Sequence, residues 1–469
     1  MEMVAINPLF RKKSIEQLLS ETQGKASLKK TLGALDLTML GIGAIIGTGI
    51  FVLTGVAAAK YAGPGLVLSF IISGVACAFA ALVYAEFSSS VPVAGSAYTY
   101  SYVSLGEFMA WIIGWDLMLE YLLAASTVAI GWSGYFQMLL NGFGIYLPAW
   151  ASGAVGSAPG ALFNLPAVLI ALLITLLLSL GVKEAARFNN IIVFVKLAVV
   201  VLFILIGVWY VKPANWTPFL PFGFKGVMGG AAIVFFAYIG FDAVSTAAEE
   251  VVNPKRDMPI GIIASLVVCT VLYIVVSLIL TGIVPYQLLD VSAPVAFALH
   301  YIHQDWAAGI ISLGAMGGIT TVLLVMLYGQ TRVFFAMSRD GLLPKVFSSV
   351  HPKYKTPFLS TWITGIVVAI IAGITPINTV AELVNIGTLS AFVFVSIGVI
   401  VLRKTQPNLR RSFRVPWVPL LPILAALFCL ILMVQLPLIT WIRFVVWLAI
   451  GLIIYFSYGI HHSLLSKDR

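Results

Sequence analysis

Long apolar stretches recur along the whole chain, and they limit the folds open to it. Of its 469 residues, 61% are hydrophobic and only 10% are charged, whereas soluble proteins are about 25% charged. A helix needs about 20 apolar residues to cross a bilayer. Twelve such stretches predict an all-α polytopic membrane protein with 12 transmembrane helices. The predicted spans are roughly 35–59, 65–88, 107–140, 164–183, 187–211, 226–250, 259–284, 306–337, 358–374, 379–403, 417–436 and 439–460.

The distribution of Lys and Arg predicts how these spans are oriented. With the N-terminus inside, 22 of the 27 Lys and Arg residues fall in cytoplasmic segments and 4 fall outside. Cytoplasmic loops carry such an excess of basic residues, so we expect both termini in the cytoplasm. The net charge of +9 then follows from membrane topology and gives no reason to expect a nucleic-acid partner.

The first span is interrupted by glycines where a spanning helix should be most regular. Residues 41–51 read Gly-Ile-Gly-Ala-Ile-Ile-Gly-Thr-Gly-Ile-Phe, and each glycine costs about 1 kcal/mol of helix propensity relative to alanine. Backbone at this depth must be buried in protein or line a wet cavity. A break near 45–47 would present N–H and C=O groups that can hold the carboxylate and ammonium of a small zwitterion. Close packing of another helix on these small residues explains this stretch equally well.

Span 226–250 contains a second interruption, because Gly240 lies at mid-span among aromatic residues and is followed by Asp242. Glycine-interrupted spans at corresponding places in two halves are the best sequence indication of a transporter site. Each interrupted span is the first of five, and an odd number of spans reverses the side of entry, which predicts two inverted repeats. The predicted domains are a cytoplasmic segment (1–34), the two repeats (35–211 and 226–404), and two extra spans with a tail (405–469).

Three charged residues, Glu120, Lys196 and Asp242, lie well inside apolar spans, where a charge costs about 2.5–3.5 kcal/mol. Lys196 could exchange a proton during transport, or it could be a permanent cation on carbonyls at a helix break. Asp242 could join its span to a neighbour, take part in gating, or cap the second half of its helix. Glu120 could meet a substrate ammonium or only form hydrogen bonds within the bundle.

Acids nearer the predicted cytoplasmic ends suggest a gate or structural ion pairs. Glu86, Glu249 and Glu250 fall in this class, with Lys255 and Arg256 as nearby partners. None of the five histidines lies inside a span, which disfavours haem or copper chemistry, and we expect no metal site.

Two further features concern the periphery and the thiols. Cys77, Cys269 and Cys429 all lie in apolar runs far apart in sequence and are interpreted as buried thiols. Residues 14–22 could form an amphipathic surface helix, and residues 295–303 a short interfacial helix.

Several stretches resemble the amino acid–polyamine–organocation (APC) superfamily. Residues 41–51 are similar to its first-span signature, and five further stretches are similar to its cationic amino acid transporter branch, as in a bacterial homologue. They follow one another in order through the eighth predicted span. These stretches are Tyr84–Tyr98, Gly114–Tyr121, Phe235–Asp242, Glu249–Arg256 and Arg332–Gly341.

The resemblance implies two inverted five-span repeats around an amino acid site at the membrane midplane. The amides of Thr48 and Gly49 would hold the substrate carboxylate. The carbonyls of Ile45, Phe236 and Ile239 would receive its ammonium, and the ring of Phe236 would cover it as an outer gate.

The resemblance also bears on selectivity. Ala237 and Gly240 are also expected among the substrate-binding residues, and Met326 would line the side-chain end of the pocket. A bulky Met there suits alanine-sized substrates. Glu120 is the one acid expected near enough to pair with a cationic side chain. Broad or neutral selectivity therefore fits at least as well as strict selectivity for arginine or lysine.

Lys196 matches a lysine that, in sodium-independent relatives, stands where sodium-coupled relatives hold an ion. We therefore expect proton coupling and no cofactor besides the proton, although the hydroxyls of Thr320 and Thr321 could ligate sodium. The 141–163 loop contains no cysteine, so no disulfide-linked heavy chain is expected. The sequence does not indicate whether a small accessory subunit binds.

Other function classes fit less well. A channel would need a wide polar lining, and the spans show few polar stripes. An enzyme would need a catalytic set, and the chain has no His-Glu-x-x-His, Gly-x-Ser-x-Gly or Walker lysine motif. We expect a secondary active transporter that moves L-amino acids across the cell membrane by alternating access. An amino acid exchanger and a sodium symporter are the alternatives within that class.

Overall fold

The computed structural model describes residues 8–14, 30–91, 96–181, 185–354 and 356–466. Within these ranges, every element longer than an isolated bridge is a helix. The predicted surface helix at 14–22 lies outside the described residues from residue 15 onward. The main helices are α2 (Ala34–Ile45), α4 (Leu66–Ser90), α5 (Ser96–Ser104), α6 (Glu107–Gly142), α7 (Leu165–Leu180), α8 (Ala185–Gly207), α9 (Gly223–Val234), α10 (Pro254–Ile283), α11 (Pro294–Tyr301), α12 (Asp305–Arg339), α13 (Phe358–Ile374), α14 (Ile377–Thr405), α15 (Leu420–Val434), α16 (Leu438–Ile454) and α17 (Ile460–His462).

Each of the twelve predicted ranges overlaps helical structure. In the part of the chain that the structure describes, eight helical stretches are long and apolar enough to cross a membrane, and four further apolar helices are shorter. The short helix expected near 295–303 is present as α11. Several helices begin with proline in the first turn, as in α10 and α11, where the missing N–H would have no intrahelical partner.

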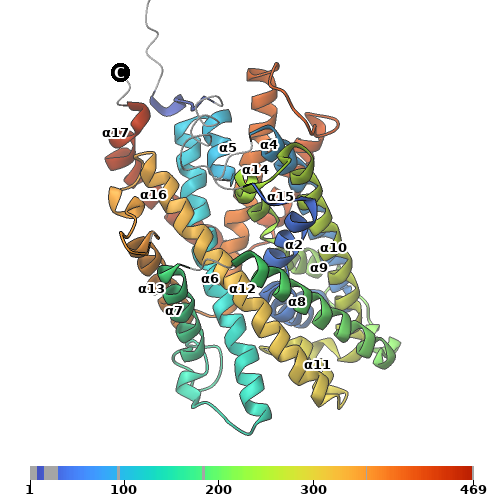
Figure 1. Cartoon of the computed structure of the whole chain (residues 1–469). Coiled ribbons are helices and arrows are strands. Elements are labelled where there is room, and N and C mark those ends of the chain that lie inside the picture. The colour runs from blue at the N-terminus through green and yellow to red at the C-terminus, as the bar shows by residue number, and fades with distance from the viewer. Residues whose placement is uncertain (1–7, 15–29, 92–95, 182–184, 355, 467–469) are drawn as a thin grey trace, which may run out of the picture.

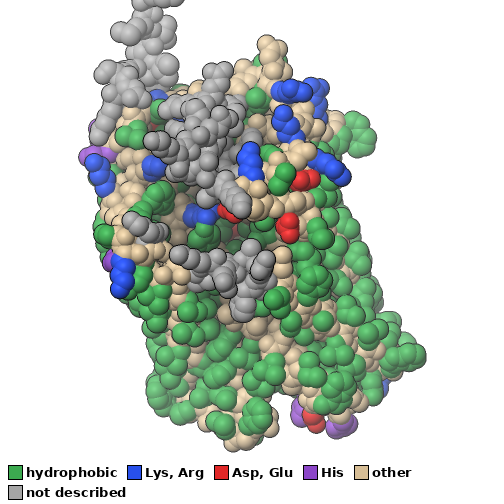
Figure 2. All heavy atoms as spheres, in the orientation of Figure 1, with side chains coloured by type: hydrophobic (Ala, Val, Ile, Leu, Met, Phe, Trp, Pro, Cys, Tyr) green, Lys and Arg blue, Asp and Glu red, His purple; other side chains and the backbone are tan. Residues whose placement is uncertain are grey.

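The helices form one bundle, with α6 packed against both α12 and α14. Figure 1 shows the described N-terminal segment and α17 at one end of this bundle, called the terminal end here, and α11 at the opposite end. Figure 2 shows Lys and Arg side chains gathered toward the terminal end, while the flank below is mostly hydrophobic. This is the charge distribution expected when the flank faces lipid and the terminal end faces the cytoplasm.

Candidate functional site

The first broken span is interrupted directly after Ile45. α2 ends there, Ile46 has extended backbone (φ −74°, ψ 105°), and helical structure resumes at Thr48. The predicted break near 45–47 is therefore confirmed. Lys196 of α8 is fully buried beside this break. Its ammonium donates hydrogen bonds to Gly43 O at 2.6 Å and to Ile46 O at 3.0 Å.

The second broken span changes conformation at Ile239 and Gly240. α9 continues into the 3-10 helix η8 (Phe235–Tyr238), Ile239 is extended, and Gly240 has φ +119° before the 3-10 helix η9 (Phe241–Glu250) begins. Residues with a Cβ rarely adopt this φ. A Cβ at Gly240 would also lie 2.8 Å from the carbonyl oxygen of Ala44. Both conformation and space therefore require glycine here.

Two polar side chains that the sequence analysis did not single out bind carbonyls of the broken spans. The Tyr273 hydroxyl of α10 lies 3.0 Å from Ile45 O and 2.8 Å from Ala237 O, so it bridges both broken spans. Asn385 of α14 donates its side-chain amide to Ala232 O at 2.7 Å. A Tyr or Asn inside an apolar run has no distinctive spacing, so the sequence alone carries no signal for either role.

A small pocket lies between the two breaks. α6 contributes Ala124 and Val128 to its wall, and α12 contributes Val322. The side chain of Thr48 is the polar one in the lining, and its buried Oγ1 makes no hydrogen bond to the described residues. Six of the nine predicted substrate-binding residues line this pocket: Ile45, Thr48, Gly49, Phe236, Ile239 and Met326.

Ala237 and Gly240 lie in the contact between the broken spans, outside the lining. A Cβ on Gly49 would lie only 2.3 Å from Cα of Ala237. This close approach of two backbones explains why small residues occupy both sides, as the packing interpretation of the glycines predicted. Gly49 permits tight packing and also lines the pocket.

Glu120 is buried but does not line the pocket. It lies one helical turn before Ala124 on α6, with the Thr388 hydroxyl and Asp242 as neighbours. Asp242 lies in the first turn of η9, where a negative charge is favourable near the helix N-terminus. No side-chain cap hydrogen bond is formed among the described residues at the start of η9, so the role of Asp242 stays a prediction.

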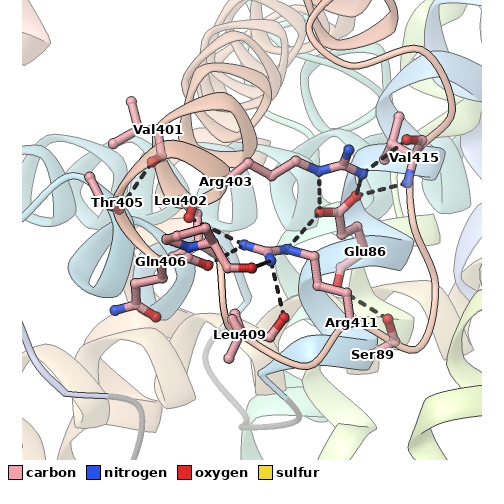
Figure 3. Close-up of polar contacts among 11 residues, drawn as sticks. Glu86, Ser89, Val401, Leu402, Arg403, Thr405, Gln406, Leu409, Arg411 and Val415 are labelled. Carbon is pink, nitrogen blue, oxygen red and sulfur yellow. Dashed lines mark hydrogen bonds and ion pairs between the residues drawn. The ribbon is translucent and has the colours of Figure 1, made fainter.

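Glu86 forms a compact ion-pair cluster at the terminal end of α4. Arg403 donates from Nε to Oε1 at 2.9 Å and from Nη2 to Oε2 at 2.5 Å, and Arg411 Nε lies 3.3 Å from Oε1. The amide of Val415 donates to Oε2 at 2.7 Å. Figure 3 shows how these groups join α4 to α14 and to the connection that follows α14.

This arrangement corrects the partners that were predicted for the peripheral acids. Glu86 pairs with Arg403 and Arg411, not with Lys255 or Arg256. The partner Arg403 lies 317 positions away along the chain, and only the packing of α14 and the connection after it against α4 brings the partners together. The carbonyl of Glu250 accepts hydrogen bonds from the amides at 31 and 32, whereas the side chain of Glu249 lies outside the described residues.

The three cysteines are buried and unpaired, as predicted. They therefore contribute apolar packing within the bundle.

Two broken spans beside a shared pocket, inside a bundle of apolar helices, are the features of a secondary transporter. The amino acid permease family model matches residues 32–457. The chain therefore belongs to the amino acid permease family of the APC superfamily, as the resemblance predicted. It is a multi-pass plasma-membrane transporter and not an enzyme.

Individual relatives support the same assignment. The chain is 60% identical to the methylthioribose transporter of Bacillus subtilis (strain 168), over 98% of this chain and 100% of that protein. It is 59% identical to the branched-chain amino acid permease of the same organism, over 98% and 99%. Vacuolar cationic amino acid transporter 4 of Arabidopsis thaliana is 38% identical, over 86% and 68%.

Proposed function

We propose that the protein imports small neutral L-amino acids together with protons, by alternating access to the pocket between its broken spans. The observation that carries this proposal is the contact of Lys196 with Gly43 O and Ile46 O. These carbonyls belong to the break that lines the pocket. Loss of a proton from the ammonium would remove its charge from the break. Protonation would thereby be linked to the geometry of the substrate site.

The apolar lining of the pocket supports neutral substrates. Met326, Val322 and Val128 surround the space next to the breaks, and no acidic side chain is among the lining residues. A cationic side chain would be desolvated there without a partner, which is unfavourable. The name of the branched-chain permease relative agrees with an apolar amino acid. The names of the methylthioribose and cationic amino acid relatives point to other ligands, so selectivity has to be measured.

The broken spans also define the proposed binding geometry. The amides at Thr48 and Gly49 would hold the carboxylate, and the carbonyls of Ile45, Phe236 and Ile239 would accept the ammonium. The unpartnered hydroxyl of Thr48 is available to the carboxylate as a further donor. Phe236 would close the pocket, and Asp242, Glu86 and Glu250 would belong to the moving or gating parts.

The same proposal includes the topology. Twelve spans would comprise two inverted five-span repeats, 35–211 and 226–404, with both termini in the cytoplasm. The placement of the two breaks at the first span of each repeat supports it, as does the gathering of basic side chains toward the terminal end.

Sodium coupling and amino acid exchange are the two alternatives. The hydroxyls of Thr320 and Thr321 donate to carbonyls of their own helix, but their oxygens retain lone pairs that could ligate sodium. The side chain of Lys196 packs against Gly318 in the same helix, and its positive charge would repel a sodium ion bound nearby.

One reconstitution experiment separates these mechanisms. The purified chain in proteoliposomes would be tested for uptake of labelled L-alanine, L-leucine and L-arginine, driven either by an inward proton gradient without sodium or by sodium alone. We expect alanine uptake on the proton arm and little arginine uptake. Uptake driven only by sodium would identify sodium, and not the proton, as the coupling ion. Exchange against internal amino acid, without uptake on either arm, would identify an antiporter.

A further inference from the structure

One face of α6 carries acids at one end and pocket residues at the other. Asp116, Glu120, Ala124 and Val128 follow at intervals of four residues, which places them on the same helix face. Ala124 and Val128 line the pocket. With a rise of 1.5 Å per residue, Asp116 lies about 12 Å below Ala124 along the helix axis, toward the terminal end. The two acids therefore lie between the pocket and the proposed cytoplasmic side.

Asp116 has an environment that its ionised form would not tolerate. Its side chain is only 1% exposed, and neither carboxylate oxygen makes a hydrogen bond to the described residues. Gly387 of α14 makes room for it, because a Cβ there would lie 3.0 Å from Oδ1. The adjacent hydroxyl is that of Ser390. A buried carboxylate without hydrogen bonds or a counter-ion is strongly unfavourable.

No cation compensates either acid, because the ion pairs of the described residues include neither Asp116 nor Glu120. α7 and α13, which pack against α6, contain no charged residue. The titratable or charged residues on the elements around the pair are Tyr84 on α4, Tyr98, Tyr100 and Tyr102 on α5, Asp242 on η9, Asp305, Tyr328, Arg332 and Arg339 on α12, Glu382, Arg403 and Lys404 on α14, and Arg443 on α16. Tyr121 lies on α6 itself. The charged residues of α12 and α14 lie toward the ends of those helices.

The nearest charged group on another element makes ionisation still less favourable, because Asp242 is itself an acid beside Glu120. The Tyr84 hydroxyl, which is close to both of those acids, also has no hydrogen-bond partner among the described residues. Like charges four residues apart on a helix repel, and burial strengthens that repulsion. At least one proton must therefore reside on the pair.

We infer that Asp116 and Glu120 form a second proton-binding site, separate from Lys196, that holds a proton in this conformation and exchanges it with the cytoplasm during transport. When the terminal end opens, a carboxyl O–H bond breaks, the proton passes to water, and a hydrated carboxylate remains until it is protonated again. This inference rests on the proposed proton coupling. It adds a site that lies outside the substrate pocket.

The test compares wild type, Asp116→Asn and Asp290→Asn in proteoliposomes. Asp290 is a matched control, since it belongs to an exposed pair with Lys60. Labelled L-alanine counterflow measures binding and alternation without a proton gradient, and a lumenal pH dye records proton entry during gradient-driven uptake. Asp116→Asn should retain counterflow within about twofold but lose accumulation and proton entry by about tenfold. Asp290→Asn should resemble wild type in both assays.

Each outcome decides a different point. Normal proton entry and accumulation in Asp116→Asn would overturn the second proton site while leaving the proposed function intact. Absence of proton entry in wild type would instead overturn the proposed coupling. If Asp116→Asn also loses counterflow, Asp116→Glu becomes decisive. Recovery of proton-driven uptake by this longer acid supports the proton site, whereas continued loss of both activities assigns Asp116 a structural role.

Discussion

At the residue scale, the site is built mainly from backbone groups held by a few buried side chains. Lys196 and Tyr273 both contact carbonyls at the first break. These carbonyls lack helical partners because the chain is extended at Ile46. Buried polar side chains therefore stabilise a helix interruption that would otherwise leave acceptors unsatisfied in the membrane.

Replacing Lys196 by Met should separate binding from coupling. The substitution preserves much of the buried side-chain volume but removes the ammonium that donates to Gly43 O and Ile46 O. We expect alanine accumulation to lose its dependence on a pH gradient, with substrate binding partly retained. Uptake at several external pH values, compared with counterflow, measures this. Unchanged pH-driven accumulation would remove Lys196 from the coupling mechanism.

Replacing Met326 by Ser should alter selectivity at the pocket. Met326 is buried in the lining, so the smaller polar residue would enlarge the space and make it more hydrophilic. We expect arginine to compete with labelled alanine at least about tenfold better, a change of about 1.4 kcal/mol. Competition curves would report it, with leucine as the apolar reference. An unaltered profile would place the substrate side chain elsewhere.

At the element scale, contacts between segments that are distant in sequence hold the terminal end together. Lys13 Nζ lies 2.6 Å from Asp340 Oδ1 at the end of α12, and the Tyr98 hydroxyl of α5 donates to Oδ2 at 2.7 Å. Lys12 also donates to Ser104 O at 2.5 Å. The N-terminal segment thereby connects α5 with α12.

Asp340→Asn should destabilise the protein by removing this buried ion pair. The side chains of Lys13 and Asp340 are only 10% and 6% exposed, and removing one partner of a buried pair costs about 3–5 kcal/mol. We expect a lower thermal unfolding midpoint in detergent. Asp290→Asn, in a half-exposed pair, should change stability by at most about 1 kcal/mol. Equal midpoints for wild type and Asp340→Asn would show that the pair contributes little.

Local sequence signals predicted where helices break better than they predicted which side chains contact one another. The glycines around Ile45 and at Gly240 indicated both breaks, because helix propensity and membrane burial act on the chain locally. Glu86 was assigned the wrong partners, because its contacts with Arg403 and Arg411 depend on long-range packing. Glu120 was expected near the substrate but lies one helical turn outside the pocket lining; it shares a helix face with Ala124, so its depth along the helix axis makes the difference.

At the scale of the whole molecule, the hydrophobic flank and the basic residues toward the terminal end suit a protein held across a bilayer in one orientation. The twelve predicted ranges match helical structure, and the eight longer apolar stretches meet the length needed to span. The direction of insertion is a prediction from Lys and Arg counts, and labelling can test it.

Single cysteines at opposite ends should be distinguished by a membrane-impermeant maleimide. The native thiols are buried, so background labelling should be low. Ser157→Cys, in the exposed connection after α6, should react in intact cells. Ser349→Cys, in the exposed connection after α12, should react only after permeabilisation. The reverse pattern would place the termini outside the cell.

The bridge formed by Tyr273 has a consequence for ligand recognition that follows from counting hydrogens. Its hydroxyl lies within bonding distance of Ile45 O and Ala237 O, but it has only one hydrogen to donate. The hydroxyl can therefore donate to only one of these carbonyls at a time, and the other can accept from a further donor. Under the proposed binding geometry an ammonium, with its three hydrogens, would be that donor. A ligand without an amino group would not supply it, however well its remaining atoms fill the pocket.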